Sequence, residues 1–215
     1  MRERAFQFQM RKALLHLKKS DPVLRAVLER VGPYRIEHRD PSFEMLVRSI
    51  VYQQLSGKVA AVIFGRLLAA VKGDLTPRRV LRLPHERMRA LGLSNQKATY
   101  IRDLAERTKS GEVDFAALPG MSDEQVIESL TRVKGIGVWT AQMFLIFGLK
   151  RLDVLPVGDL GVRSAIKKAY GLEELPKPVD MEELARAWRP YCSAATGNRR
   201  ARLSTRSLRL RSSLT

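Results

Sequence analysis

The sequence predicts an all-α fold, and three observations support that class. Apolar residues recur at intervals of three and four along most of the 215-residue chain, as they do on one face of a helix. Residues that favour helix N-termini precede these runs, and glycine follows several of them. The alternation that is typical of strands does not occur at length, so at most residues 33–37 are expected to be extended.

Capping residues divide the chain into helices. A serine or aspartate side chain before an apolar run can accept a hydrogen bond from a backbone N–H of the first helical turn. A glutamine three residues after such a serine completes a capping box, and a glycine after the run favours the end of a helix. The expected N-caps and stops are, in chain order, Asp21 before Pro22, Gly32, Ser42, Ser56, Ser122 with Gln125, and Gly171 after a helix from about Gly161 to Tyr170.

The net charge is the unusual feature of the composition. A formal charge of +17 and a pI near 10.6 point to a polyanionic partner, with nucleic acid ahead of an acidic membrane surface. No apolar run approaches the roughly 18 residues that cross a bilayer, and the N-terminus lacks a secretory signal, so a cytoplasmic, nucleoid-associated protein is expected. Because Cys192 is the single cysteine, an internal disulfide and a four-cysteine iron–sulfur cluster are excluded.

A glycine-flanked turn in the segment LTRVKGIGVWTAQMF carries the strongest functional signal. Gly135 and Gly137 flank Ile136, and both are expected to serve a tight turn between two helices because glycine takes positive φ without steric cost. The N–H groups from about Gly137 to Thr140 then form a helix N-terminus that can bind a phosphate, and Lys134 adds a positive charge. The pattern is typical of a helix-hairpin-helix DNA-binding element, with an ordinary helical corner as the alternative.

The wider sequence resembles the helix-hairpin-helix (HhH-GPD) DNA glycosylases, and within them the 3-methyladenine DNA glycosylase II branch, which repairs alkylated DNA. Three ordered segments between about Asp21 and Ser193 carry the resemblance: FEMLVRSIVYQQLS, LGLSNQKATYIRDL, and GIGVWTA with the later PVGD. It implies a two-lobed helix-hairpin-helix glycosylase fold with the active-site cleft between the lobes. The expected parts are residues 1–40, N-terminal helices of the second lobe; 41–150, a helical lobe that ends in the hairpin; 151–195, the rest of the second lobe with the catalytic Asp; and 196–215, a basic, disordered tail.

The resemblance assigns the catalytic carboxylate to Asp159. Cleavage of an N-glycosidic bond develops positive charge on the sugar, which a buried carboxylate can stabilise while it orients a water molecule. A role as N-cap of the helix that begins at Leu160 is the alternative, and both roles can hold together. Arg163, one helical turn after Asp159, either contacts phosphate or Asp159 or is solvated.

Trp139 stands where bifunctional relatives carry a lysine that attacks the sugar and forms a Schiff base. The resemblance therefore implies a monofunctional glycosylase without lyase activity, whose tryptophan stacks on a flipped cationic base. A core tryptophan at a helix start is the alternative. Met143, one turn further along the same face, and Tyr52 complete the expected base pocket, with a plain core role as the alternative for Met143.

The loop between the helices capped by Ser42 and Ser56 is expected to enter DNA. The resemblance places Gln54 where one branch has an apolar wedge, and a glutamine can both fill the space left by a flipped nucleotide and hydrogen-bond the orphaned base. Leu55 is the second expected wedge residue, with a solvated loop as the alternative. The expected contacts to the DNA backbone are Lys134, Gly135, Ile136, Gly137 and Thr140.

The expected activity is hydrolysis of the N-glycosidic bond of alkylated purines, 3-methyladenine and 7-methylguanine, by a monomer acting on double-stranded DNA. An alkylated base is already cationic and leaves without a strong general acid, so one carboxylate can suffice. The alternatives are a glycosylase for another lesion and a non-enzymatic helix-hairpin-helix DNA-binding protein. Apart from a monovalent cation that the resemblance allows at the carbonyl groups of Val133 and Ile136, no metal or cofactor is expected, since the three histidines lack metal-ligand spacing.

The end of the chain departs from the family pattern. Residues 197–215 contain six arginines and no acidic or aromatic residue, and without them the net charge would be +17 − 6 = +11. A basic tail that lies on phosphates is one interpretation. A divergent, disordered segment that replaces a packing helix is the other, and we prefer it.

Overall fold

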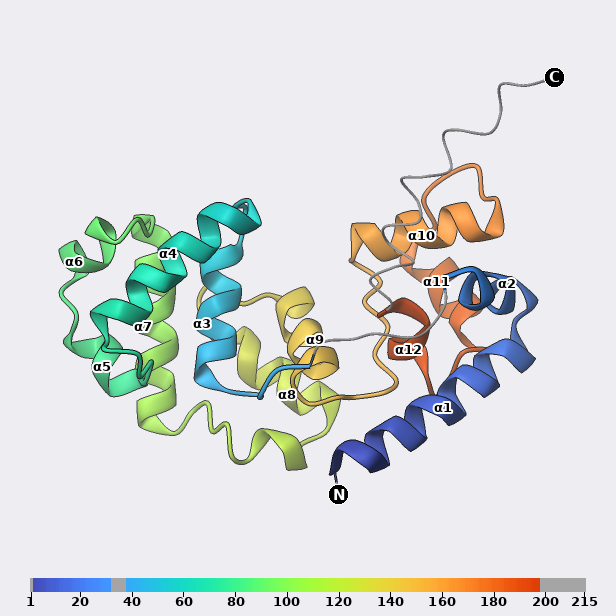
Figure 1. The fold of residues 1–215 in the computed structure, drawn as a ribbon, viewed down its shortest axis with the longest axis horizontal. Helices are drawn as coiled ribbons and strands as arrows, with labels where there is room; N and C mark the ends of the chain where they lie inside the picture. Colours follow the sequence, from blue (N-terminus) through green and yellow to red (C-terminus); the bar gives the residue numbers. More distant parts are fainter. Residues whose placement is uncertain (1, 32–37, 198–215) are drawn as a thin grey trace. The chain divides into compact units, whose positions relative to one another are not determined.

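The computed structural model describes residues 2–31 and 38–197, shown in colour in Figure 1. Every regular element in these residues is helical, which confirms the predicted all-α class. Among these helices, none combines the length and the apolar character needed to cross a bilayer. The helices are α1 (Arg2–Ser20), α2 (Pro22–Val31), α3 (Phe43–Tyr52), α4 (Gly57–Ala70), α5 (Pro77–Arg82), α6 (His85–Ala90), α7 (Asn95–Ser110), the 3₁₀-helix η1 (Leu118–Gly120), α8 (Asp123–Thr131), α9 (Val138–Phe147), α10 (Leu160–Tyr170), α11 (Pro178–Ala185) and α12 (Cys192–Thr196).

The chain forms two compact units. Among the described residues, unit 1 combines 2–31 with 150–197, whereas unit 2 is the continuous stretch between them, His38–Leu149. Unit 1 contains α1, α2 and α10 to α12, and unit 2 contains α3 to α9, coloured from light blue to yellow in Figure 1. The hairpin and the loop after α3 therefore belong to unit 2, whereas Asp159 belongs to unit 1.

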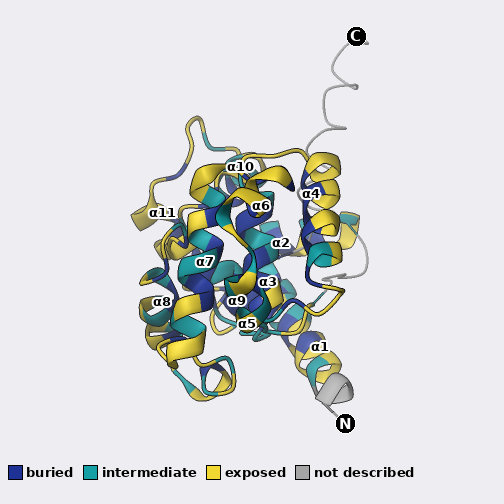
Figure 2. Ribbon diagram, turned by 90° about the vertical axis from the view of Figure 1, so that its left-hand side faces the viewer, coloured by how far each residue is buried: buried dark blue, intermediate teal, exposed yellow. Residues whose placement is uncertain are grey.

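Helix α7 is central to the packing of unit 2. It packs against α3, α5 and α6, while α3 also packs against α4 and α9, and α8 packs against α9. The buried sides of α7 and α9 appear dark blue in Figure 2. Burial of these apolar sides is the main favourable contribution to the stability of the unit. The largest fully buried side chains of unit 2 are Leu46, Ile50, Leu67, Met88, Ile101, Leu104, Leu118, Leu130, Phe144 and Leu145.

A buried carboxylate joins distant parts of unit 1. Asp21 Oδ1 accepts hydrogen bonds from the backbone N–H groups of Val23 (2.9 Å) and Leu24 (3.0 Å), which confirms it as the N-cap of α2. Its Oδ2 accepts hydrogen bonds from Trp188 Nε1 (2.8 Å) and from the hydroxyl of Tyr170. Burial alone would raise the pKa of Asp21, but the Tyr170, Leu24, Trp188 and Val23 donors outweigh it and lower that pKa below its ordinary value.

The other predicted caps also form, where the structure describes them. Ser42 and Ser56 accept hydrogen bonds from the first turns of α3 and α4, and Ser122 with Gln125 makes a complete capping box on α8. Gly171 ends α10 in the left-handed conformation, with φ of 66°. The expectations for Gly32, for residues 33–37 and for most of the arginine-rich tail lie outside the described residues.

The start of the expected disordered tail is wrong. Thr196 is the last residue of α12 rather than the first residue of a tail. Gly197 is buried, and its N–H donates to the carbonyl oxygen of Ser193 at 2.9 Å. The prediction failed because CSAAT is too short to show helical periodicity, whereas buried Cys192 and Ala194 anchor this helix in the core of unit 1.

Candidate functional site

The hairpin between α8 and α9 depends on one of its two glycines. Gly135 has φ of +80°, and a Cβ added to it would lie 2.0 Å from Cδ2 of Tyr100, so that only glycine fits there. The expectation of positive φ at Gly137 is wrong, because Gly137 has φ of −94° and ψ of 174°. A Cβ there would meet no described atom within 4 Å. Steric crowding by the protein itself therefore does not explain a glycine at position 137.

Helix α9 begins without a capping side chain. Gly137 is its N-cap residue and provides no side-chain acceptor, and the first turn contains no acidic residue. The first backbone bond onto the cap is from Ala141 N–H to the Gly137 carbonyl oxygen, at 3.1 Å. Since the first N–H groups of a helix have no acceptor within it, the N-terminus of α9 is suited to an anion. The Thr140 side chain is buried, so Thr140 has only its backbone to offer here.

Lys134 is less free than its sequence position suggests. Its side chain is 64% exposed, yet its ammonium lies 3.8 Å from Asp103 Oδ1. Its backbone N–H donates to Asp103 Oδ2 at 2.9 Å. Asp103 therefore holds the backbone before Gly135, and the Lys134 side chain keeps enough exposure to meet a phosphate.

The carbonyl groups of the hairpin are partly engaged. The Val133 carbonyl oxygen accepts a hydrogen bond from Ile136 N–H at 3.1 Å, and the Gly135 carbonyl oxygen accepts one from Gln53 Nε2 at 2.8 Å. A carbonyl oxygen has a second lone pair, so Val133 and Ile136 still offer the neutral oxygen ligands that suit a monovalent cation. Within the described residues, no three His, Cys, Asp or Glu side chains are grouped as metal ligands.

The loop between α3 and α4 holds the two expected wedge residues at the surface. Gln54 adopts the left-handed conformation, with φ of 55°, and is exposed. Leu55 is 38% exposed, so its side chain is accessible from solvent. Left-handed φ at a residue other than glycine or asparagine is strained and often marks a functional loop.

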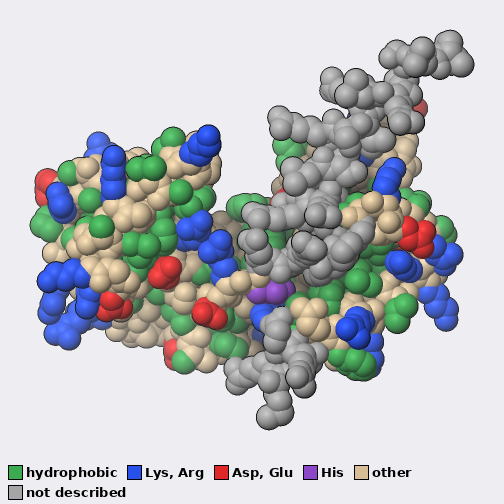
Figure 3. Space-filling model, viewed as in Figure 1, with side chains coloured by type: hydrophobic (Ala, Val, Ile, Leu, Met, Phe, Trp, Pro, Cys, Tyr) green, Lys and Arg blue, Asp and Glu red, His purple; other side chains and the backbone are tan. Residues whose placement is uncertain are grey.

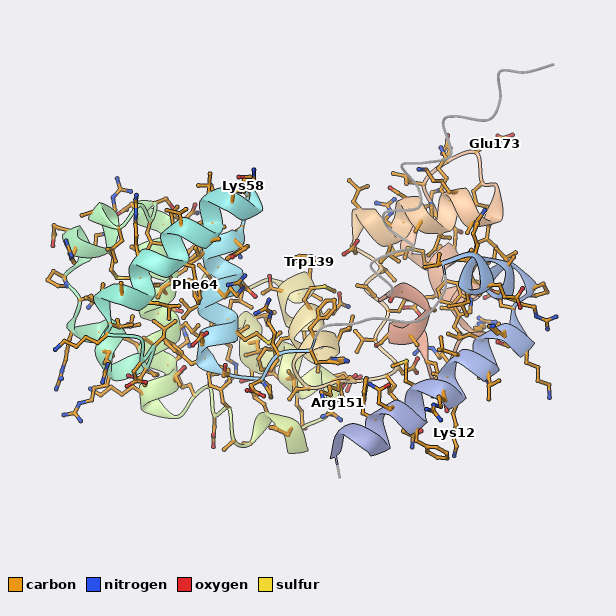
Figure 4. All side chains as sticks on the ribbon, in the orientation of Figure 1. Lys12, Lys58, Phe64, Trp139, Arg151 and Glu173 are labelled. Carbon is orange, nitrogen blue, oxygen red and sulfur yellow. The ribbon has the colours of Figure 1, made fainter. Side chains whose placement is uncertain are left out.

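The three expected pocket residues are all accessible, but to different degrees. Trp139 is 48% exposed at the start of α9, where Figure 4 labels it, so the alternative of a core tryptophan is wrong. Met143 is half-buried one turn later. Tyr52 is also half-buried, and the Arg48 guanidinium lies over its ring, 4.2 Å from the centroid. One face of the Tyr52 ring is therefore already covered by a cation.

Asp159 is a buried acid at the start of α10. Asp159 is only 6% exposed, and its Oδ1 accepts a hydrogen bond from Val162 N–H at 2.9 Å. The N-cap role is therefore present, which leaves the catalytic role open. The backbone N–H of Asp159 donates to Pro156 O at 2.9 Å and fixes the turn that precedes the helix. Arg163 Nε donates to Pro176 O at 3.0 Å, and its backbone N–H donates to the Asp159 carbonyl oxygen at 2.9 Å, so a contact of its side chain with phosphate or with the Asp159 carboxylate stays a prediction.

Sequence reasoning missed two residues beside the site. Gln53 links the loop after α3 to the hairpin through Gly135, 82 positions away. Lys97 donates to the carbonyl oxygens of Val51 (2.7 Å) and Gln53 (2.6 Å). Both lie in segments that carry the family resemblance, but no local pattern shows that they meet.

Comparison with known proteins agrees with this arrangement. Residues 47–190 match the family model of the HhH-GPD superfamily base excision DNA repair proteins. The chain is 34% identical over 191 residues to DNA-3-methyladenine glycosylase 1 of Schizosaccharomyces pombe, covering 86% of this chain and 83% of that protein.

Solved structures show the same similarity. A Bacillus halodurans DNA-3-methyladenine glycosidase aligns with a TM-score of 0.81 and 38% identity, over 92% of this chain and 90% of that one. The Schizosaccharomyces pombe 3-methyladenine DNA glycosylase (Mag1), in complex with abasic DNA, aligns with a TM-score of 0.79 and 32% identity, over 91% of this chain and 97% of that one. The chain therefore belongs to the HhH-GPD superfamily of base excision DNA repair proteins.

Proposed function

We propose that the protein is a monofunctional DNA glycosylase that hydrolyses the N-glycosidic bond of alkylated purines, chiefly 3-methyladenine and 7-methylguanine, in duplex DNA. The observation that carries this proposal is Asp159, a buried acid in a chain with a net charge of +17. An uncharged serine or asparagine would cap α10 about as well, so a module that only binds DNA gains nothing from the negative charge of this acid. The relatives named as DNA-3-methyladenine glycosylases support the choice of substrate.

The proposed role of Asp159 is electrostatic. As the bond between the sugar and the base lengthens, positive charge develops on the sugar, and a fixed carboxylate stabilises that charge more than it stabilises the ground state, in which the sugar is uncharged. The same carboxylate can orient the attacking water molecule. Because the N-alkylated purine carries its own positive charge, it departs as a neutral base, and no second carboxylate is required as a general acid.

Base recognition is assigned to Trp139, with Met143 and Tyr52 as neighbours in the pocket. An exposed indole is the side chain best suited to stack on a cationic, flipped base. Since Trp139 stands at the position of the lysine nucleophile of bifunctional relatives, no amine is available there to form a Schiff base. The product should therefore be an intact strand with an abasic site.

DNA binding is assigned to unit 2. The open N-terminus of α9, with Gly135, Ile136 and Gly137 in the turn and Lys134 beside it, would hold one phosphate, while Gln54 and Leu55 would fill the place of the flipped nucleotide. Long-range attraction would come from the basic surface, such as the Lys and Arg side chains gathered over α5 in Figure 3, where Arg78 and Arg82 are exposed. We further propose that the protein works as a monomer without a cofactor, with a monovalent cation at the hairpin carbonyls as the one candidate ion.

The decisive experiment is base release. Duplex DNA treated with a methylating agent is incubated with the protein, and the released bases are separated by chromatography. Release of 3-methyladenine and 7-methylguanine supports the proposal, whereas release of only deaminated or mismatched bases from parallel substrates supports a glycosylase for another lesion. DNA binding without release of any base supports the non-enzymatic alternative.

A further inference from the structure

One side of α7 contacts both loops to which DNA binding is assigned. Lys97, Tyr100 and Asp103 follow one another at intervals of three, so they lie along one side of this helix. The loop after α3 (residues 53–55) meets the N-terminal end of that side, and the hairpin (residues 133–137) meets the rest of it. The segment LGLSNQKATYIRDL, so far without an assigned role, contains all three residues.

Lys97 holds the C-terminal end of α3. Its ammonium donates to the carbonyl oxygen of Val51 at 2.7 Å and to that of Gln53 at 2.6 Å. The last carbonyl groups of a helix have no partner within it and carry partial negative charge, so an ammonium is well placed there. Partial burial of the ammonium lowers the pKa of Lys97 below its ordinary value.

Tyr100 and Asp103 hold the hairpin from the same helix. The Tyr100 ring lies directly under Gly135, where it leaves no room for a Cβ, and Asp103 accepts the backbone N–H of Lys134 at 2.9 Å. Arg107 Nε, 3.1 Å from Asp103 Oδ2, fixes that carboxylate in turn.

Gln53 connects the two loops directly. Its carbonyl oxygen accepts from Lys97, while its amide Nε2 donates to the carbonyl oxygen of Gly135 at 2.8 Å. Gln53 immediately precedes the strained, left-handed Gln54, so the residue before the strained one is held at two points, through its backbone carbonyl and through its side-chain amide. Strain of this kind persists only where the surrounding structure enforces it.

We propose that Lys97 and Gln53 are positioning residues that lock the wedge loop to the hairpin. When the hairpin binds a DNA phosphate, this lock places Gln54 and Leu55 at a fixed distance from that phosphate. The inference rests on the proposed function, and specifically on the wedge. Its physical content is that a free loop would lose conformational entropy on insertion, whereas a locked loop has already lost it. Loss of the lock should therefore lower excision where a stacked base must be displaced and should have little effect on excision where the base is already unstacked.

The test compares Lys97→Met with Lys109→Met, a matched change at an exposed lysine near the other end of α7. Excision is measured on one alkylated base placed either in a normal duplex or in an unpaired bulge. For Lys97→Met we expect a loss of about tenfold in the duplex, equivalent to about 1.4 kcal/mol, and less than about a threefold loss in the bulge. A 2-aminopurine beside the lesion should show a weaker fluorescence rise on binding. Lys109→Met should resemble wild type on both substrates.

Two further variants keep the proposal testable if Lys97→Met folds poorly. Lys97→Arg retains a charged donor and should restore part of the duplex activity. Gln53→Met removes the bond to Gly135, and combining it with Lys97→Met should cost less than the sum of the two single effects, because both changes break one lock. Equal losses in duplex and bulge, or a 2-aminopurine signal like that of wild type, would overturn the proposal. If the wild-type protein releases no alkylated base at all, the proposed function fails instead.

Discussion

Two helices of this protein begin in opposite ways. Helix α9 starts at Gly137, with no side-chain cap and no acid in its first turn, and its neighbours Val138 and Trp139 are exposed. Helix α10 starts at Asp159, whose buried carboxylate accepts the N–H of Val162. Both N-termini carry the partial positive charge of a helix dipole.

The difference shows how the same local charge can serve two purposes. At α9 the N-cap residue supplies no side-chain acceptor, and the proposed partner of the partial positive charge is an anion from outside. At α10 the protein supplies its own anion, and the helix holds that carboxylate in one orientation. We infer that a phosphate belongs at the first and a developing sugar cation at the second.

The largest effect is expected from Asp159→Asn. Asparagine caps a helix about as well as aspartate, so the melting temperature should stay close to wild type while the negative charge is lost. Base excision should fall by about a hundredfold or more, and affinity for DNA should stay the same or rise, because repulsion of phosphate is removed. Chromatography of released bases, binding titration and thermal melting measure the three quantities. Excision within about threefold of wild type would contradict the catalytic role.

Gly135→Ala should destabilise the hairpin before α9 for steric reasons alone. The new Cβ would meet the Tyr100 ring and would also occupy a left-handed backbone, so unfolding free energy should fall by about 2 kcal/mol. The control is Gly111→Ala, where φ is +86° but no described atom lies within 4 Å of the added Cβ. Thermal melting should show a clearly larger decrease for Gly135→Ala. Equal decreases would mean that Tyr100 moves aside without cost.

Gly137→Asp would turn the start of α9 into a copy of the start of α10. The backbone there is already extended and a Cβ has open space, so an aspartate N-cap should leave stability unchanged or raise it by a few tenths of a kcal/mol. Binding to undamaged duplexes should weaken about tenfold for every sequence, since a phosphate contact carries no base preference. Gly137→Ser is the uncharged control. Filter binding with unchanged affinity for the aspartate variant would show that the hairpin does not hold the backbone.

The last prediction is that no lyase activity is observed. With Trp139 in place of a lysine nucleophile, borohydride should trap no covalent adduct between the protein and damaged DNA, and the strand should break only after alkali. A bifunctional glycosylase on its own substrate serves as the positive control. A stable reduced adduct that forms while bases are released would assign lyase activity to another amine.

Local features of the fold were predictable from the sequence, because they depend on neighbouring residues. Ser42, Ser56 and the Ser122–Gln125 capping box act on the next turn of the chain, and each forms as expected. Gly171 ends α10 for the same local reason.

Features that depend on distant residues were not predictable. The sequence cannot show which of Gly135 and Gly137 takes positive φ, because the choice is enforced by Tyr100, from another helix. Likewise, Lys97 donates to carbonyl groups 44 and 46 positions away. Gln54 is left-handed although it is not a glycine, so its sequence gives no signal of that conformation. The roles of Asp159, Trp139, Met143, Tyr52 and the wedge residues rest on the family resemblance and await the experiments above.

The discontinuity of unit 1 bears on the order of folding during synthesis. Unit 2 is one continuous stretch, so it can fold once its last residue has left the ribosome. Asp21, in contrast, takes donors from Tyr170 and Trp188, which are 149 and 167 positions away. At about 10 residues per second, the sides of α1 and α2 that pack against α12 and α10 stay uncovered for on the order of 15 s. Helices α1 and α2 are therefore synthesised before unit 2 but are fully buried only after it, and in the meantime their uncovered apolar sides are exposed to aggregation.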